Sequence, residues 1–142
     1  MYQLANTFFI KWFGLLIEDE SLFARLDETF TPIITQDGYD MPLAHLSGGE
    51  KTSVALAYRL ALNHVINDVV GEVHTKGMLI LDEPTDGFST QQIARMGEVF
   101  RNLSLTQIIL VSHEQSMESL AQTIYTITKS QGQSSIHNHT AP

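Results

Sequence analysis

Two short apolar runs constrain the fold of this chain more than any other feature of its sequence. Met78–Leu81 is an uninterrupted apolar run, which predicts a strand covered on both faces in a mainly parallel sheet. Gln107–Val111 predicts a second buried strand, and a helix is expected between the two because Ser89 and Gln92 have capping-box spacing. A strand, helix, strand order implies parallel pairing through a right-handed crossover. With Thr123–Thr128 as a further strand, the sequence predicts an α/β lobe.

A long helix is predicted to begin at Ser47. Ser47 and Glu50 have the spacing of a capping box, in which each side chain satisfies an unpaired backbone N–H of the first turn. Apolar residues then recur at helical spacing at Val54, Ala57, Ala61 and Val65. The helix between the two apolar runs has an inner stripe of its own, formed by Ile93, Met96 and Phe100. Amphipathic helices are therefore expected to cover the sheet.

The N-terminal segment is predicted to be helical. Residues 2–17 are markedly apolar, but a membrane-spanning helix needs about 20 apolar residues and Lys11 interrupts this run. We therefore expect a helix that docks on protein, with no membrane segment. A second short helix is predicted from Ser21 to Glu28.

A β-hairpin is predicted next. Phe30–Thr35 is β-prone, and Pro32 within it is suited only to an edge strand. Gln36–Gly38 has the composition of a turn, after which Tyr39–Leu43 can return antiparallel. The fold class is therefore α/β, with an N-terminal helix and a hairpin attached.

The C-terminal segment is expected to be simple. Gln115–Gln122 is predicted to be helical, and residues 130–142 form a polar tail. His137 and His139 have a spacing that a metal could use, but no acidic or further histidine partner lies near them in the sequence. Metal binding by the tail is therefore not expected.

Composition limits the classes of function. The chain has 142 residues and 43% hydrophobic content, which fits one folded domain or one lobe of a larger one. It contains no cysteine, so a reducing, cytoplasmic environment is the expected location. A formal charge of -8 argues against strong nucleic-acid binding by this segment itself, since lysine and arginine supply most of that affinity.

Ser47, Gly48 and Gly49 form a candidate anion site. Paired glycines let backbone approach an anion closely, and a helix N-terminus adds unpaired N–H groups and a favourable dipole. The alternative is an ordinary capped helix, because capping boxes are common.

Asp82 and Glu83 form a second candidate site. They follow a predicted buried strand, at the edge where open α/β sheets place ligands. Asp82 is suited to hold Mg²⁺ while Glu83 orients and deprotonates an attacking water. The alternative is an acidic turn shaped by Pro84.

His113 ends the next predicted strand and is expected at the same sheet edge as Glu83. A neutral imidazole there can donate a hydrogen bond to a phosphate oxygen, although a lone histidine is more often structural. A P-loop requires G-x-x-x-x-G-K-[ST], and the near match Gly49–Thr52 contains an extra glutamate and lacks the first glycine. The chain thus carries residues for activating water without the loop that grips a triphosphate.

Taken together, these motifs resemble the second half of an ABC-type ATPase head, which is P-loop NTPase-like. LSGGE resembles the signature motif, the strand ending in DEPT resembles the Walker B motif and D-loop, and the strand ending in SH resembles the switch histidine. LSGGEKTSVALAYRLAL and DEPTDGFS are most similar to the Rad-fifty family of DNA double-strand-break repair ATPases. The resemblance runs from about Tyr39 to Thr128.

The resemblance implies a C-terminal lobe. In that family the P-loop lies in an N-terminal half, and a coiled coil with a zinc-binding tip separates the two halves, so no zinc is expected in this fragment. Residues 1–29 would be the foot of the coiled coil or its replacement, residues 30–129 the lobe, and residues 130–142 the tail. The apolar surface of the N-terminal helix, residues 2–17, would then contact the missing half or the nuclease.

The resemblance also implies roles for single residues. Ser47, Gly48, Gly49 and Glu50 would contact the γ-phosphate of ATP bound to the opposing head. Asp82 would serve Mg²⁺, Glu83 the hydrolytic water and His113 the γ-phosphate.

Two further positions are less like the family pattern or have a simple alternative. Arg59 matches a basic position that changes partners when ATP rotates the head, but it could equally be an exposed helix arginine in a surface pair. Ser89 stands where the D-loop commonly carries an aspartate, so Ser89 is a candidate for the D-loop role, and Asp86 or backbone groups are the alternative.

The implied function is ATP hydrolysis with Mg²⁺, possible only when the P-loop half completes the head. The implied partners are that half, a second head, a Mre-eleven type nuclease and DNA held by the assembled complex, in the cytoplasm at the nucleoid or chromatin. ATP-driven dimerisation would regulate DNA binding and the nuclease. The alternatives are a chromosome-maintenance or transporter ATPase fragment, or a non-catalytic docking module.

Overall fold

The computed structural model describes residues 1–69 and 77–140. The chain divides into two compact units, Met1–Val111 and Ser112–Pro142. The boundary after Val111 lies inside the segment 30–129 that was expected to form one lobe, so each unit is described by itself.

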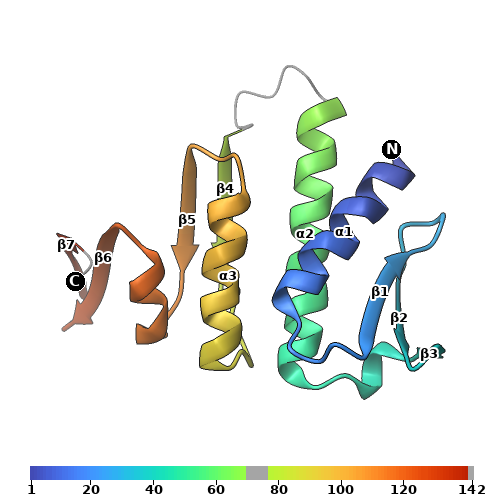
Figure 1. The fold of residues 1–142 in the computed structure, drawn as a ribbon. Coiled ribbons are helices and arrows are strands. Elements are labelled where there is room, and N and C mark those ends of the chain that lie inside the picture. The colour runs from blue at the N-terminus through green and yellow to red at the C-terminus, as the bar shows by residue number, and fades with distance from the viewer. Residues whose placement is uncertain (70–76, 141–142) are drawn as a thin grey trace. The chain divides into compact units, whose positions relative to one another are not determined.

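The first unit contains three helices and five strands in its described part. The helices are α1 (Tyr2–Leu16), α2 (Gly48–Val69) and α3 (Thr90–Asn102), with a short 3₁₀ turn η1 (Leu43–His45). The strands are β1 (Leu22–Leu26), β2 (Pro32–Gln36), β3 (Tyr39–Met41), β4 (Met78–Asp82) and β5 (Gln107–Val111). Figure 1 shows that α2 and α3 begin, and β4 and β5 end, at the same side of this unit.

The predicted helix from Ser21 to Glu28 is wrong, because this segment contains β1. Its burial alternates: Leu22, Ala24 and Leu26 are buried while the two residues between them are exposed, which is the period of a strand. β1 pairs antiparallel with β2, and the ladder runs from Leu22 opposite Gln36 to Leu26 opposite Pro32. The backbone of Leu26 is further fixed by α1, since its N–H donates to Asn6 Oδ1 at 2.7 Å.

The predicted hairpin is confirmed, but β2 is the central strand of a sheet with the order β1-β2-β3. Pro32 therefore does not mark an edge strand. It is tolerated because it is the first residue of β2. Asp37 and Gly38 both have positive φ, 51° and 85°, as a two-residue hairpin turn requires.

The turn between β1 and β2 is organised by Asp27. Its Oδ1 accepts hydrogen bonds from the Thr29 hydroxyl at 2.7 Å and from the Thr31 N–H at 2.9 Å. The Thr29 hydroxyl, followed by the Thr31 backbone, lowers the pKa of this carboxyl because both donate to its charged form.

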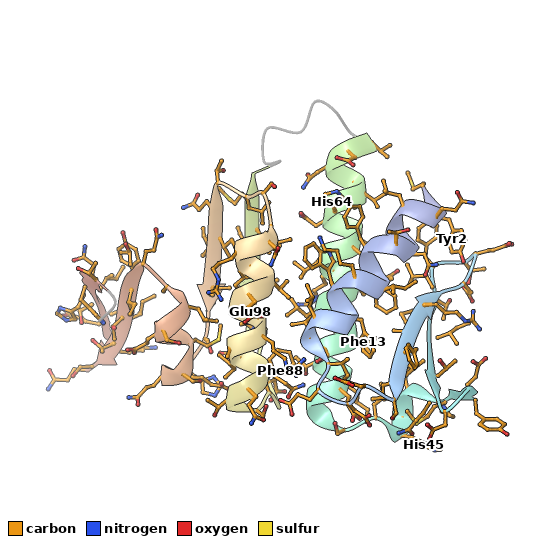
Figure 2. All side chains as sticks on the ribbon, in the orientation of Figure 1. Tyr2, Phe13, His45, His64, Phe88 and Glu98 are labelled. Carbon is orange, nitrogen blue, oxygen red and sulfur yellow. The ribbon has the colours of Figure 1, made fainter. Side chains whose placement is uncertain are left out.

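α1 supplies most of the aromatic core of the first unit. Its buried residues are Ala5, Phe9, Trp12, Phe13 and Leu16, and the helix packs against α2, β1 and α3. Phe13, labelled in Figure 2, is one of these buried residues. The expectation that α1 docks on protein is confirmed, and the protein is this chain itself. No helix in residues 1–69 or 77–140 is long and apolar enough to cross a membrane.

β4 and β5 form the predicted parallel pair, in which Asp82 lies opposite Val111. The prediction that β4 is covered on both faces is wrong for this chain. Leu79 and Leu81 are buried, but Ile80 is 61% exposed and Val111 of β5 is 51% exposed. One face of the parallel pair is therefore apolar and uncovered within the described residues.

The second unit contains a 3₁₀ helix η2 (Gln115–Leu120) and strands β6 (Thr123–Ser130) and β7 (Gln133–Thr140). Residues 130–142 were expected to be a tail, but most of them form β7, antiparallel to β6. β6 is paired with β7 over its whole length, from Thr123 opposite Thr140 to Ser130 opposite Gln133. The connecting residues Gln131 and Gly132 have φ of 48° and 79°, again the geometry of a two-residue hairpin turn.

The packing of α1 gives a stability prediction. Leu16 is fully buried at the end of α1, so Leu16→Ala should lower the free energy of unfolding by about 2–5 kcal/mol through lost burial and a residual cavity. Ile10→Ala is the matched control on the same helix. Ile10 is 48% exposed, so its truncation should cost less than about 1 kcal/mol. Urea unfolding of both variants measures the difference, and equal losses would contradict this placement of α1.

Candidate functional site

The start of α2 is held by the predicted capping box. The Ser47 N–H donates to Glu50 Oε2 at 2.7 Å, and the Glu50 N–H donates to Ser47 Oγ at 3.3 Å. Ser47 is exposed, whereas Leu46 before it is buried and anchors the chain. The structure therefore gives Glu50 a capping role and leaves the solvent side of Ser47 and Gly48 accessible.

Gly49 has a packing role that the sequence interpretation missed. A Cβ on Gly49 would lie 2.8 Å from the Gly87 carbonyl oxygen and 2.6 Å from Gln92 Oε1. A Cβ on Gly87 would lie 3.1 Å from the carbonyl carbon of Gly48, and Gly87 also has a φ of 78°. Glycine is therefore required at both positions, because the two backbones touch. The glycine after Asp86 in DEPTDG was the only sequence signal of this contact.

Asp82 and Glu83 lie at the carboxyl end of β4, as predicted. Asp82 is the last residue of the strand, and the Glu83 N–H donates to the Val111 carbonyl oxygen at 2.8 Å. Glu83 has a φ of 44°, a left-handed conformation that is uncommon for a residue other than glycine. Both side chains are exposed. The parallel neighbour β5 thus fixes Glu83 in a conformation that turns the chain sharply out of the sheet.

A pocket of about 130 Å³ brings three of the predicted site residues together. Arg59 of α2 lines it from one side, and Asp82 and Glu83 line it from the other. The remaining lining residues are Thr52, Ala55, Leu56 and Pro84. A cation and two carboxylates therefore share one small polar cavity at the carboxyl end of the parallel pair.

The pocket fits a partial site for Mg²⁺. Mg²⁺ is usually bound by one or two carboxylates together with waters and substrate phosphates, so the Asp82 carboxylate fits as a protein ligand of such a site, with Glu83 beside it in the pocket. A metal site formed by protein ligands alone would need at least three such side chains. In the part of the chain that the structure describes, no group of three or more His, Cys, Asp or Glu side chains could hold a metal ion.

The other predicted site residues lie elsewhere. His113 belongs to the second unit, so its role beside Glu83 stays a prediction. Ser89 is the N-cap of α3: its Oγ accepts from the Gln92 N–H at 3.1 Å and donates to Glu18 Oε1 at 2.6 Å. The predicted cap is confirmed, and a D-loop role for Ser89 stays a prediction.

A protein-family comparison matches residues 29–102 to the family described as "SbcC/RAD50-like, Walker B motif". The chain is 30% identical to the DNA double-strand break repair Rad50 ATPase of Pyrococcus abyssi over 119 residues, which are 82% of this chain and 13% of that protein. It is 32% identical to the same-named protein of Methanocaldococcus jannaschii, over 75% of this chain and 10% of that protein. The chain thus spans only a small part of the length of these relatives.

Solved structures show the same fold. A structure described as "Structural biochemistry of ATP-driven dimerization and DNA stimulated activation of SMC ATPases" superposes with a TM-score of 0.74 at 19% identity, covering 99% of this chain and 86% of that one. The SMC head domain from Thermotoga maritima superposes with a TM-score of 0.67 at 26% identity, covering 96% of this chain and 47% of that one. The family match, these relatives and the fold agree, and the chain belongs to the SbcC/RAD50-like family as the C-terminal lobe of its ATPase head.

Proposed function

We propose that this chain supplies the signature motif and the water-activating residues of an ATP-hydrolysing head whose P-loop lies in another lobe. The observation that carries the proposal is a pocket shared by two elements. Asp82 and Glu83, at the end of β4, line it together with Arg59 of α2, which we call the signature helix because it begins at the LSGGE motif. A carboxylate pair at the carboxyl end of parallel strands is placed where α/β sheets bind ligands.

The uncovered face of the parallel pair supports a second lobe. Ile80, Ile109 and Val111 are exposed on β4 and β5, although strands of this kind are normally covered on both faces. A P-loop lobe that extends or covers this sheet would bury them. The same lobe would bring the nucleotide triphosphate to the carboxyl end of the strands, beside Asp82 and Glu83.

In the assembled head, Asp82 would help to hold Mg²⁺, whose charge neutralises the phosphates during the reaction. Glu83 would accept a proton from the attacking water through its carboxylate and direct the water's oxygen at the γ-phosphorus, whose bond to the bridging oxygen would break so that ADP leaves. The left-handed backbone at Glu83, held by the hydrogen bond to Val111, fixes where that carboxylate begins. His113 would donate to a γ-phosphate oxygen, and Arg59 would form charge pairs that depend on the nucleotide.

The start of α2 would act on a different nucleotide. Ser47 and Gly48 are exposed at the start of α2, where the Ser47 hydroxyl and the helix N-terminus suit a γ-phosphate held by an opposing head, with Gly49 buried directly behind them. Two heads would then close on two nucleotides. That ATP-driven dimerisation would regulate DNA binding and a Mre-eleven type nuclease in a nucleoid- or chromatin-associated complex.

The first test removes the general base. In a head assembled from this chain and the P-loop half, Glu83→Gln should lower kcat by about 100-fold or more while ATP-dependent dimerisation persists, because the binding groups remain. Glu98→Gln is the matched control, since Glu98 is exposed on α3 away from the pocket and is labelled in Figure 2. A Glu83→Gln head that turns over ATP as fast as the control would refute the assigned base.

The second test blocks the contact in trans. Ser47→Arg should abolish ATP-dependent dimerisation, because a bulky cation replaces the hydroxyl at the exposed start of α2. Ser47→Ala is the control for lost capping: both variants lose the hydrogen bond from the Glu50 N–H to Ser47 Oγ, at a cost of about 1 kcal/mol, so their thermal stabilities should match. Light scattering with ATP measures the oligomeric state. Normal dimerisation of Ser47→Arg would count against a phosphate contact across the dimer.

A further inference from the structure

Polar side chains join the start of α2 to the loop that follows Pro84. We call Thr52, Ser53 and Gln92 the clasp. Thr52 Oγ1 donates to the Asp86 carbonyl oxygen at 2.6 Å, across 34 positions of sequence. This bond ties the second turn of the signature helix directly to the backbone of the 85–89 loop.

Gln92 makes the second connection from inside the protein. Its Oε1 accepts from the Ser89 N–H at 3.0 Å, and its Nε2 donates to Ser53 Oγ at 3.3 Å. Ser53 is fully buried and Gln92 is 7% exposed. Both ends of the amide are therefore used, which fixes its orientation, and breaking either bond would leave a buried polar group unpaired.

Close packing completes the connection. Gln92 Oε1 lies directly under Gly49, and the backbone of Gly87 lies against Gly48 and Gly49. The two segments therefore lie so close that no side chain fits between them, and the clasp resists their moving apart. Attraction through hydrogen bonds and steric contact together define one relative position of the two segments.

We propose that Thr52 and Gln92 are positioning residues that make the Ser47–Gly49 turn and the 85–89 loop move as one body. This inference rests on the proposed function, in which both segments face an opposing head. A single rigid surface would let the two segments engage that head together. Loss of the clasp would not change how the P-loop lobe binds its nucleotide. It would lower kcat, because the two segments would no longer engage the opposing head together.

Hydrogen exchange in the chain by itself tests the clasp directly. The Phe88 N–H donates to the Thr85 carbonyl oxygen at 2.8 Å and the Ser89 N–H donates to Gln92, so both amides report on opening of the loop. Thr52→Val keeps the shape of the side chain and removes the donor. Because one such bond shifts an opening equilibrium by about 3- to 10-fold, both amides should exchange about 3- to 10-fold faster. Thr52→Ser, which keeps the hydroxyl, should restore wild-type rates.

Thr7→Val is the matched control. It also removes a threonine hydroxyl that donates to a carbonyl oxygen, that of Gln3 at 2.9 Å, but it lies on the exposed side of α1. Exchange at Phe88 and Ser89 should not change in this variant. Wild-type exchange rates in Thr52→Val, or equally raised rates in Thr7→Val, would overturn the clasp.

The ATPase assay of the assembled head tests the consequence. Thr52→Val should lower kcat about 3- to 10-fold at an ATP KM within about twofold of wild type, and Thr52→Ser should rescue it. Raised exchange with unchanged kcat would overturn the positioning role. If the wild-type head does not hydrolyse ATP, the proposed function fails, and the exchange result still decides whether the two segments form one body.

Discussion

The contact between two glycine-containing segments determines how the site is arranged. Gly48 and Gly49 at the start of α2 meet Gly87, so closely that a Cβ on Gly49 or Gly87 would clash. This contact holds the start of α2 against the loop that follows β4. Arg59 of α2 then lines the same pocket as Asp82 and Glu83. The glycines are thus needed for internal packing as well as for any approach to a phosphate. The capping hydrogen bonds of Ser47 and Ser89 then fix where the two helices begin.

The rest of the first unit supports α2. α1 buries its aromatic side against α2, and Phe9 meets Tyr58 edge-on at 6.2 Å. The end of α1 is also joined to α3, because Arg95 Nη1 donates to the Ile17 carbonyl oxygen at 2.8 Å and Glu18 accepts from Ser89. α2, at whose start the candidate anion site lies, is therefore packed against an apolar helix, α1, whose end is itself joined by hydrogen bonds to Ser89 and α3.

Sequence patterns predicted the elements of the site better than those around it. Both capping boxes and the parallel pairing of β4 with β5 were predicted correctly, although not the burial of these strands, because the signals are local: an S-x-x-E or S-x-x-Q spacing and a short apolar run. β1 was mistaken for a helix because five residues carry little periodicity, and its pairing with β2 decides its structure. β7 was missed because its side chains are polar, while a Gln131-Gly132 turn and cross-strand pairing define it. The clasp could not be predicted, since Thr52 and Asp86 meet only in the folded chain.

The central claim is that this lobe holds the water-activating and signature residues of a head whose nucleotide is gripped by another lobe. The most direct measurement is Mg²⁺-dependent ATP hydrolysis, with gel filtration in parallel, for the purified chain alone and for the chain mixed with the P-loop half. The account predicts no turnover by the chain alone, and turnover with an ATP-dependent dimer in the mixture. Appreciable Mg²⁺-dependent turnover by the chain alone would contradict it.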